Sequence, residues 1–294
     1  MTGVAAPQSL VWIDGEPRPD SGPHISGRDR GLTLGDGVFE TMRVRGGTVF
    51  RLERHLARLT RALAALEIPT PGELREWVTR AAKRADGETS IRLTVTRGTG
   101  SSGVAPPVPS RPTVILSAGP MPTFPSSLYT AGLAAHVASG RRNEYAMTAG
   151  LKTLAYVDAV AGLLEARRAG AEEALFLDTQ GHCSEATASN IFAWTGKELI
   201  TPPLSCGVLP GITREAVLEL ARAEGMPVAE RAFGLDELTA AAEVFLTSSL
   251  RGLAPVVRLN GQPIGRAIPG SRSQHLSTAY LALVDRECTA ARDR

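Results

Sequence analysis

The 294-residue chain is 43% hydrophobic and 21% charged, which is typical of a globular protein with one large or two medium cores. Its 32 basic and 30 acidic residues leave a net charge of +2, so the sequence offers no basic field for nucleic acid. Three cysteines without a CxxC pair, no signal-peptide pattern and no long apolar run together predict a cytoplasmic protein that does not span a membrane.

The first part of the chain predicts strands alternating with helices. Residues 37–52 read as a hairpin that reverses at Gly46 and Gly47, and leucines at three- and four-residue spacings predict an amphipathic helix over 54–66. Further strands are expected at 10–17, 90–97 and 113–119, a second helix at 71–84, and a loop rich in Gly, Ser and Pro at 98–112.

A proline-rich connector is expected to divide the chain. The stretch "GPMPTFPSS" at 119–127 carries three prolines, so we expect an N-terminal domain at 1–118, a connector at 119–130 and a C-terminal domain at 131–294. Beyond it, strands are expected at 133–137, 173–178, 190–194, 198–201, 243–249 and 255–264, and helices at about 154–168, from near Gly211, and at 271–286. The fold class is therefore mixed α/β.

Lys152 is the residue whose chemistry asks for explanation. Only three of the basic residues are lysines, and Lys83 and Lys197 lie in polar surroundings, whereas Lys152 lies in the small, apolar and aromatic run "TAGLKTLAYVDAV". A lysine can lose its proton and become an amine nucleophile that forms a Schiff base, which an arginine cannot. The alternative is a lysine whose stem is covered and whose ammonium reaches water.

Several common chemistries are missing from the sequence. It contains no GxxxxGK[ST] phosphate loop, no GxGxxG, no HExxH and no GxSxG. The five histidines show no metal-ligand spacing, so no metal site is expected.

A set of scattered positions suits an anionic aromatic cofactor. Glu185, in a turn of small residues, is either solvated or partnered by a protonated ring nitrogen. Gly211, Ile212 and Thr213 begin a helix whose amides favour a phosphate, although Thr213 could instead cap that helix. Together with Lys152, Arg58 and the hydroxyls that end at Ser249, they describe a site for pyridoxal 5′-phosphate.

The same residues lie in motifs that resemble a known family. In order, these are "DRGLTLGDGVFETMRV" with "HLARL", "GLKTLAYVDAV", "EALFLDTQGHCSEATASNIF", "ELITPPLSCGVLPGITREAV" and "EVFLTSSLRGLAPVVRLNG". The chain is similar to the class IV aminotransferases, the fold-type IV pyridoxal phosphate enzymes that include branched-chain aminotransferases, D-amino acid aminotransferases and aminodeoxychorismate lyases.

The resemblance implies a role for each residue. Lys152 would form the Schiff base, Glu185 would hold the pyridine nitrogen, and Tyr156 would lie by the phenolic oxygen of the cofactor. Its phosphate would be bound by Arg58, the backbone amides of Ile212 and Thr213, and Ser249. The resemblance also implies a smaller N-terminal α/β domain, a larger C-terminal pseudo-barrel domain, and a homodimer with the site between the domains.

The substrate is less strongly indicated. Phe39 replaces the tyrosine of the D-amino acid enzymes, and the loop "GSSGVAPP" lacks their arginine and histidine. A substrate carboxylate would then meet Arg30, Arg92, Arg97 or Arg251. We expect an aminotransferase that moves an amino group from an amino acid to a 2-oxo acid. The alternatives are an aminodeoxychorismate lyase, which eliminates pyruvate, and a non-catalytic cofactor-binding protein.

Overall fold

The computed structural model describes residues 10–19, 22, 24–84 and 87–292. Their contacts form two compact units. Unit 1 takes the described residues of Met1–Pro122 together with Leu151–Ala155 and Val284–Arg294, and unit 2 takes Thr123–Gly150 and Tyr156–Leu283. Two later segments thus belong with the N-terminal residues. The division expected from the sequence, into domains at 1–118 and 131–294 with a connector at 119–130, stays a prediction.

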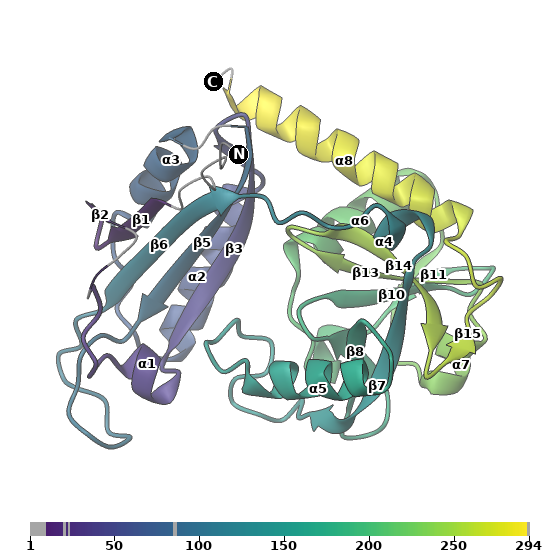
Figure 1. Cartoon of the computed structure of the whole chain (residues 1–294), viewed down its shortest axis with the longest axis horizontal. Coiled ribbons are helices and arrows are strands. Elements are labelled where there is room, and N and C mark those ends of the chain that lie inside the picture. Colours follow the sequence, from purple (N-terminus) through teal and green to yellow (C-terminus); the bar gives the residue numbers. More distant parts are fainter. Residues whose placement is uncertain (1–9, 20–21, 23, 85–86, 293–294) are drawn as a thin grey trace, which may run out of the picture. The chain divides into compact units, whose positions relative to one another are not determined.

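Unit 1 is built on a six-stranded antiparallel sheet in the order β2-β1-β6-β5-β3-β4 (Figure 1). Its strands are β1 (Leu10–Ile13), β2 (Glu16–Arg18), β3 (Gly37–Arg45), β4 (Thr48–Val49), β5 (Glu88–Thr96) and β6 (Thr113–Pro120). Its helices are α1 (Arg30–Leu34), α2 (Leu52–Ala65) and α3 (Leu74–Arg84). The hairpin and both long helices were expected, and α1 was not.

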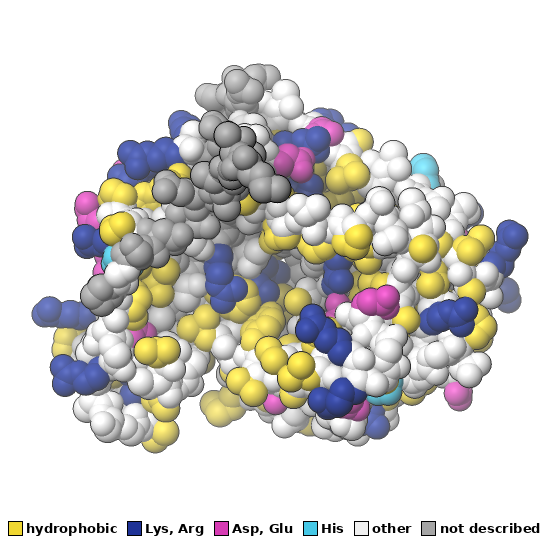
Figure 2. All heavy atoms as spheres, in the orientation of Figure 1, with side chains coloured by type: hydrophobic (Ala, Val, Ile, Leu, Met, Phe, Trp, Pro, Cys, Tyr) yellow, Lys and Arg dark blue, Asp and Glu magenta, His cyan; other side chains and the backbone are white. Residues whose placement is uncertain are grey.

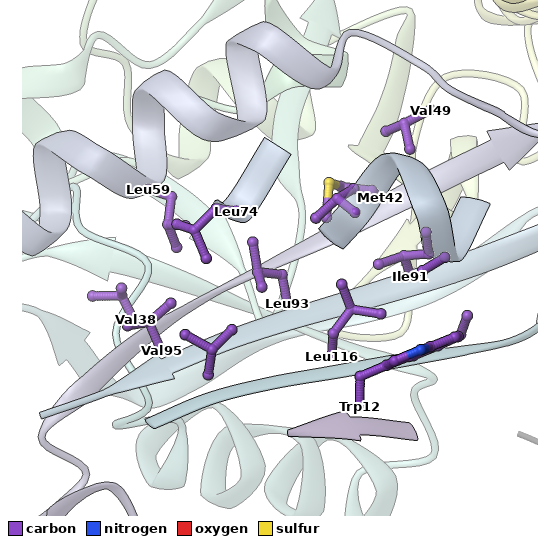
Figure 3. Packing of buried hydrophobic residues seen from close by; sticks show 14 of the residues in the cluster. Trp12, Val38, Met42, Val49, Leu59, Leu74, Ile91, Leu93, Val95 and Leu116 are labelled. Atoms are coloured by element: carbon purple, nitrogen blue, oxygen red, sulfur yellow. The ribbon is translucent and has the colours of Figure 1, made fainter. Parts of the chain in front are cut away.

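The core of unit 1 lies between the sheet and helices α2 and α3. Alternate residues of the three central strands point to that side, as Val38, Met42, Ile91, Leu93 and Leu116 do in Figure 3. Leu59 and Leu74 meet them from the two helices (Figure 3). The other face of β3 and β5 therefore carries the intervening residues.

Unit 2 contains a closed barrel. Strands β10, β13, β14, β7, β8 and β9 pair in that order, and β9 pairs back to β10. The strands are β7 (Leu133–Arg142), β8 (Glu173–Asp178), β9 (Cys183–Ala186), β10 (Asn190–Trp194), β11 (Leu199–Thr201), β12 (Val228–Glu230), β13 (Glu243–Ser248), β14 (Gly252–Leu259) and β15 (Gln262–Pro263). All six barrel strands contribute to one buried apolar cluster, so side chains fill the barrel.

Short and long helices accompany the barrel. They are α4 (Ser127–Thr130), α5 (Val157–Arg168), the 3₁₀ turn η1 (Leu204–Cys206), α6 (Ile212–Ala223) and α7 (Leu235–Thr239). The last helix, α8 (Ser271–Arg292), begins in unit 2, and its residues from Val284 onward belong to unit 1. Gly162 of α5 lies against Phe176 of β8, where a Cβ would come within 2.5 Å of the ring. The expectation that this helix begins near Leu154 is wrong, because Thr153 bridges to Val38 of β3 and the Leu154 amide donates to the Gly37 carbonyl, so α5 begins only at Val157.

Charged side chains are interspersed on the face of the molecule drawn in Figure 2, where dark blue and magenta groups alternate with apolar ones. This agrees with the nearly balanced composition. None of the helices in the described part of the chain combines the length and apolar character that a membrane span needs.

Candidate active site

Backbone pairing with β3 positions Lys152. The amide of Phe39 donates to the Lys152 carbonyl at 3.0 Å, and the amide of Leu154 donates to the Gly37 carbonyl at 3.0 Å. A Cβ at Gly37 would lie 2.7 Å from the Val95 carbonyl and 2.9 Å from the Leu154 side chain. Only glycine at position 37 lets the lysine segment approach the strand this closely.

The Lys152 ammonium lies over an aromatic ring. Its Nζ is 4.3 Å from the centroid of Phe39, and Cζ of Arg92 is 3.8 Å from the same centroid. The register of β3 and β5 pairs Thr41 with Arg92, which places Phe39 and Arg92 on one sheet face. Phe39 is buried and Lys152 is half-buried, so this ring is an apolar wall beside the lysine.

A buried ionic network lies on the opposite, inward face of β3. Glu40 Oε1 and Oε2 accept from Nε and Nη2 of Arg58 at 2.8 and 2.7 Å. His55 Nδ1 lies 2.7 Å from Glu40 Oε2. All three side chains are buried, and because a carboxylate can only accept, the Nδ1–H tautomer of His55 is the donor.

Charge and burial compete within this network. Burial opposes ionisation of Glu40, but the hydrogen bonds and charge of Arg58, with help from His55, lower its pKa to about 2. Burial lowers the pKa of His55, and the positive charges of Arg58 and Lys152 act in the same direction. Glu40 is therefore ionised, and it fixes the guanidinium that the sequence assigns to a phosphate.

Unit 2 holds Glu185 beside the loop that precedes α6. Glu185 Oε2 accepts from the Leu209 amide at 3.0 Å, and Asn190 Nδ2 donates to the Leu209 carbonyl at 2.9 Å. Arg142 Nη2 is 3.5 Å from Glu185 Oε1. Glu185 and Asn190 face each other across β9 and β10, so both strands hold one residue of the loop.

The helix start predicted at Gly211 is confirmed. Gly211 is the N-cap residue of α6 and makes no side-chain cap, and an α-helix has no internal acceptor for the first-turn amides of Ile212 and Thr213. The Thr213 hydroxyl lies 3.4 Å from the Tyr280 hydroxyl, so the capping alternative is wrong. A Cβ at Gly211 would lie 2.0 Å from Asn190 Oδ1, which excludes larger residues.

Three further predicted or neighbouring positions lie in unit 2. Tyr156 is the N-cap residue of α5, and Ser249 directly follows β13. On the same strand the Thr247 hydroxyl is buried and has no hydrogen-bond partner among the described residues. Thr247 pairs in register with Asn190, so this hydroxyl belongs to the region of the α6 loop.

The four candidate arginines differ in their surroundings. Arg30 and Arg97 both bind Asp36 through Nε, at 2.8 and 2.7 Å, and each donates further hydrogen bonds to loop carbonyls. Arg251 Nη2 binds the buried carboxylate of Glu173 at 2.8 Å and also the hydroxyl of Ser189 at 2.9 Å. Arg92 alone of the four is exposed.

Sequence reasoning missed Glu40, His55 and Arg142. Glu40 occupies an inward position of a strand whose other inward residues are apolar, and His55 precedes Arg58 by one helical turn, so alternation and helical spacing could have revealed both. Arg142 has no such signal in "SGRRN", because its ion pair with Glu185 depends on barrel closure.

Comparison with known proteins assigns the family. The family model described as amino-transferase class IV matches residues 37–259, which is most of the chain. The chain belongs to this family. The family expected from the sequence is thereby confirmed. The mixed α/β fold with its closed barrel confirms the expected fold class.

Relatives of the class IV chain carry three different activities in their names. A D-alanine aminotransferase from Bacillus licheniformis is 31% identical, with 85% of this chain and 88% of that protein covered. The crystal structure of 4-amino-4-deoxychorismate lyase from Pseudomonas aeruginosa is 36% identical, with a TM-score of 0.81 and coverage of 92% and 97%. The branched-chain amino acid aminotransferase from Escherichia coli is 28% identical, with a TM-score of 0.87 and coverage of 94% of both chains.

Proposed function

We propose that the protein is a pyridoxal 5′-phosphate-dependent aminotransferase that moves an amino group from an amino acid to a 2-oxo acid. The observation that carries this proposal is Lys152, which backbone pairing to β3 holds with its amine over Phe39. Another branched-chain aminotransferase of this fold, 27% identical to the chain, has been crystallised with pyridoxamine 5′-phosphate, the aminated form of this cofactor.

The donor groups fit that cofactor. A primary amine, a carboxylate tied to a backbone amide and a helix start without a side-chain cap match its aldehyde, ring nitrogen and phosphate. The buried Thr247 hydroxyl beside the α6 loop adds an unpaired donor of the kind that a phosphate oxygen accepts.

Each residue has a definite task in the proposed reaction. When bound, the cofactor supplies the aldehyde that carries the amino group and the electron sink for the substrate carbanion. Lys152 holds the cofactor at rest and, once released as a free amine, moves the proton at the substrate α-carbon. Glu185 keeps a proton on the ring nitrogen. Arg58, Ser249 and the amides of Ile212 and Thr213 hold the phosphate, and Tyr156 lies by the phenolic oxygen.

Arg92 is the arginine that we assign to the substrate carboxylate. Arg92 is exposed, and its Cζ lies over the Phe39 ring, the same ring that lies beside the Lys152 amine. Arg30 and Arg97 are buried and both bind Asp36, and Arg251 binds the buried Glu173. Arg92→Gln should raise the KM for the 2-oxo acid at least about tenfold and change kcat less, because charged hydrogen bonds contribute about 1.5–3 kcal/mol. Arg45→Gln, on the same sheet face, is the control, and an unchanged KM in Arg92→Gln contradicts the assignment.

The lysine can be tested directly because the chain contains only three. Borohydride reduction of the holoprotein should fix the cofactor on the Lys152 peptide and leave the Lys83 and Lys197 peptides unmodified. Lys152→Ala should lose about 10⁴-fold in kcat, the upper range for a general base, and Lys83→Ala should keep full activity. Labelling of another lysine, or full turnover in Lys152→Ala, would overturn the proposal.

The second candidate is the lyase, which the 36% identity to the Pseudomonas aeruginosa enzyme favours. Single amino acids that convert the cofactor to its pyridoxamine form indicate transamination. Pyruvate released from aminodeoxychorismate without an acceptor indicates the lyase. No spectral change with any amine leaves only cofactor binding.

We also propose a homodimer in the cytoplasm. Val157, Val160 and Leu164 form an exposed apolar stripe along α5, which a second copy would cover. The thiols of Cys183, Cys206 and Cys288 form no disulfide, which suits a reducing compartment.

A further inference from the structure

Three donor atoms of different chemistry meet in unit 2, on side chains to which the proposed reaction gives no role. They belong to Asp178 at the end of β8, His182 just before β9 and Cys206 in η1, and all lie within 4.8 Å of one another. His182 Nδ1 is 3.1 Å from Asp178 Oδ2. No metal site was expected from the sequence, because its histidines show no ligand spacing and its cysteines form no CxxC pair.

The backbone fixes each of the three side chains. Asp178 Oδ1 accepts from the amides of Gln180 and His182 at 3.0 and 2.8 Å, which leaves Oδ2 directed toward His182. The Asp178 amide in turn donates to the His182 carbonyl at 2.8 Å. These bonds close a tight turn that sets the carboxylate and imidazole against each other before any ligand arrives.

The cysteine is anchored separately. The Cys206 amide donates to the Pro203 carbonyl at 3.0 Å, and the Ser184 hydroxyl donates to the Cys206 carbonyl at 2.7 Å. Asp178 and Cys206 are 1% and 3% exposed, while the His182 side chain is 37% exposed. The cluster is therefore enclosed on two sides and open to solvent at the imidazole.

The thiol is not suited to be a nucleophile. Burial, followed by contact with Asp178, raises the pKa of Cys206 to about 11, so the thiol keeps its proton in the free protein. A reactive cysteine needs an electropositive, partly exposed setting, and the acidic neighbour provides the opposite.

The geometry instead suits a metal ion. In a tetrahedral zinc site, bond lengths of about 2.0–2.3 Å separate neighbouring nitrogen and oxygen donors by about 3.4 Å and a sulfur from either by about 3.6 Å. The distance of 3.1 Å between His182 Nδ1 and Asp178 Oδ2 is close to the first of these spacings. The three donor atoms all lie within 4.8 Å of one another, so small side-chain adjustments suffice to reach the spacings of a zinc site. A divalent ion would also neutralise one carboxylate and one thiolate in a buried place.

We propose that Asp178, His182 and Cys206 bind one divalent ion of the zinc class, with water in the fourth position. Imidazole and thiolate select zinc, cobalt or cadmium over magnesium or calcium. The ion replaces the thiol proton, which passes to solvent. The site ties the β8–β9 turn to η1, and Glu185 and the α6 loop follow these two segments in sequence, so the ion is structural and braces them.

Cobalt titration of the holoprotein tests the site. Co²⁺ should give intense ligand-field bands of tetrahedral form and a thiolate charge-transfer band, saturate at one ion per chain, and be displaced by Zn²⁺. His182→Gln and Cys206→Ser should each weaken Co²⁺ binding by about 100-fold or more. Even residues that only hydrogen-bond to metal ligands change metal affinity by about 10- to 100-fold, and losing a ligand itself should cost at least as much. Zn²⁺ should raise the Tm of the wild type but not of these variants.

Cys183→Ser is the matched control, because Cys183 is a buried thiol next to His182 and lies outside the cluster. It should keep the cobalt spectrum. His182→Gln changes a partly exposed side chain and should fold with an unchanged metal-free Tm. Absence of tetrahedral bands in the wild type, or their persistence in either ligand variant, overturns the proposal; persistence would place the ion on the cofactor or the surface.

Discussion

At the residue scale, the negative charge of Glu40 is important for the stability of the folded protein. It is fully buried and neutralises Arg58, so Glu40→Gln replaces the carboxylate beside this buried guanidinium with a neutral amide. Breaking a buried pair by removing one partner costs about 3–5 kcal/mol. We expect the free energy of unfolding in urea to fall by about that amount, and cofactor affinity to fall with it.

Glu53→Gln is the comparison on helix α2. Glu53 pairs with Arg75 on the surface, and exposed ion pairs contribute less than about 1 kcal/mol. If both variants lost the same free energy of unfolding, the Glu40–Arg58 pair would contribute no more than an exposed ion pair does. A stable Glu40→Gln protein with weakened cofactor binding would instead show that the carboxylate orients Arg58 without supporting the core.

At the scale of the element, one arginine holds a long loop. Arg30 donates from Nη1 to the Gly103 and Ala105 carbonyls at 3.0 and 3.2 Å and from Nη2 to the Val104 carbonyl at 2.9 Å. Its Nε binds Asp36. Arg30→Ala removes every one of these bonds, so hydrogen exchange of the backbone amides around residues 100–110 should become markedly faster.

Arg97 separates this effect from the loss of the shared ion pair. It also binds Asp36, but its other nitrogens donate to the Leu66 and Glu67 carbonyls at the end of α2. Arg97→Ala should therefore speed exchange near residues 66–67 and leave the loop protected. The same exchange pattern in both variants would mean that Asp36, and not the carbonyl contacts, fixes the loop.

The elements also show what a sequence can predict. The leucine spacing of α2 and the alternation of β5 are local patterns, and the structure confirms both, with Leu59 and Leu63 buried. Lys152 stood out because its residue type is rare in this chain. The helix after it was expected to begin near Leu154, but Thr153 instead forms a bridge with Val38 of β3, more than a hundred residues earlier, and α5 begins only at Val157.

The sequence could not predict which charged groups pair or which side chains form the proposed metal site, for the same reason. Glu40 with Arg58 and Arg142 with Glu185 meet only when strands and helices have packed. Asp178, His182 and Cys206 do not follow the CxxC or HExxH spacing of metal motifs, and they come together only because the β8–β9 turn lies against η1. Local periodicity carries no information about such long-range contacts.

At the scale of the whole molecule, the exposed stripe on α5 predicts how two copies associate. Val157, Val160 and Leu164 are 78%, 56% and 47% exposed and lie on one side of the helix. Val160→Glu places a charge in that stripe and should convert the dimer to a monomer in sedimentation equilibrium. Glu172→Gln, an exposed change beyond the helix, should leave the dimer intact, and a wild-type monomer would rule the interface out.

Stability against acid is the second whole-molecule property, and two buried groups, Glu40 and His55, contribute to it with the same sign. The pKa of Glu40 falls from 4.5 in the unfolded chain to about 2, so its contribution is full above pH 4.5 and is lost as the pH falls through 2. The pKa of His55 is lowered from 6.5 in the folded protein. Below pH 6.5 the unfolded chain therefore binds a proton at His55 more readily than the folded chain, and protonation favours unfolding. Both effects make the protein less stable toward acid.

Because the pKa of Glu40 falls from 4.5 to about 2, its ionisation contributes about 3 kcal/mol to stability at neutral pH. Urea midpoints of the wild type should therefore fall from pH 7 to pH 3. Glu40→Gln starts lower but should fall less steeply below pH 4.5, because it has no carboxylate there to protonate, whereas Glu53→Gln should run parallel to the wild type. Parallel curves for Glu40→Gln and the wild type would mean that Glu40 titrates near its ordinary pKa and that Arg58 does not hold it ionised.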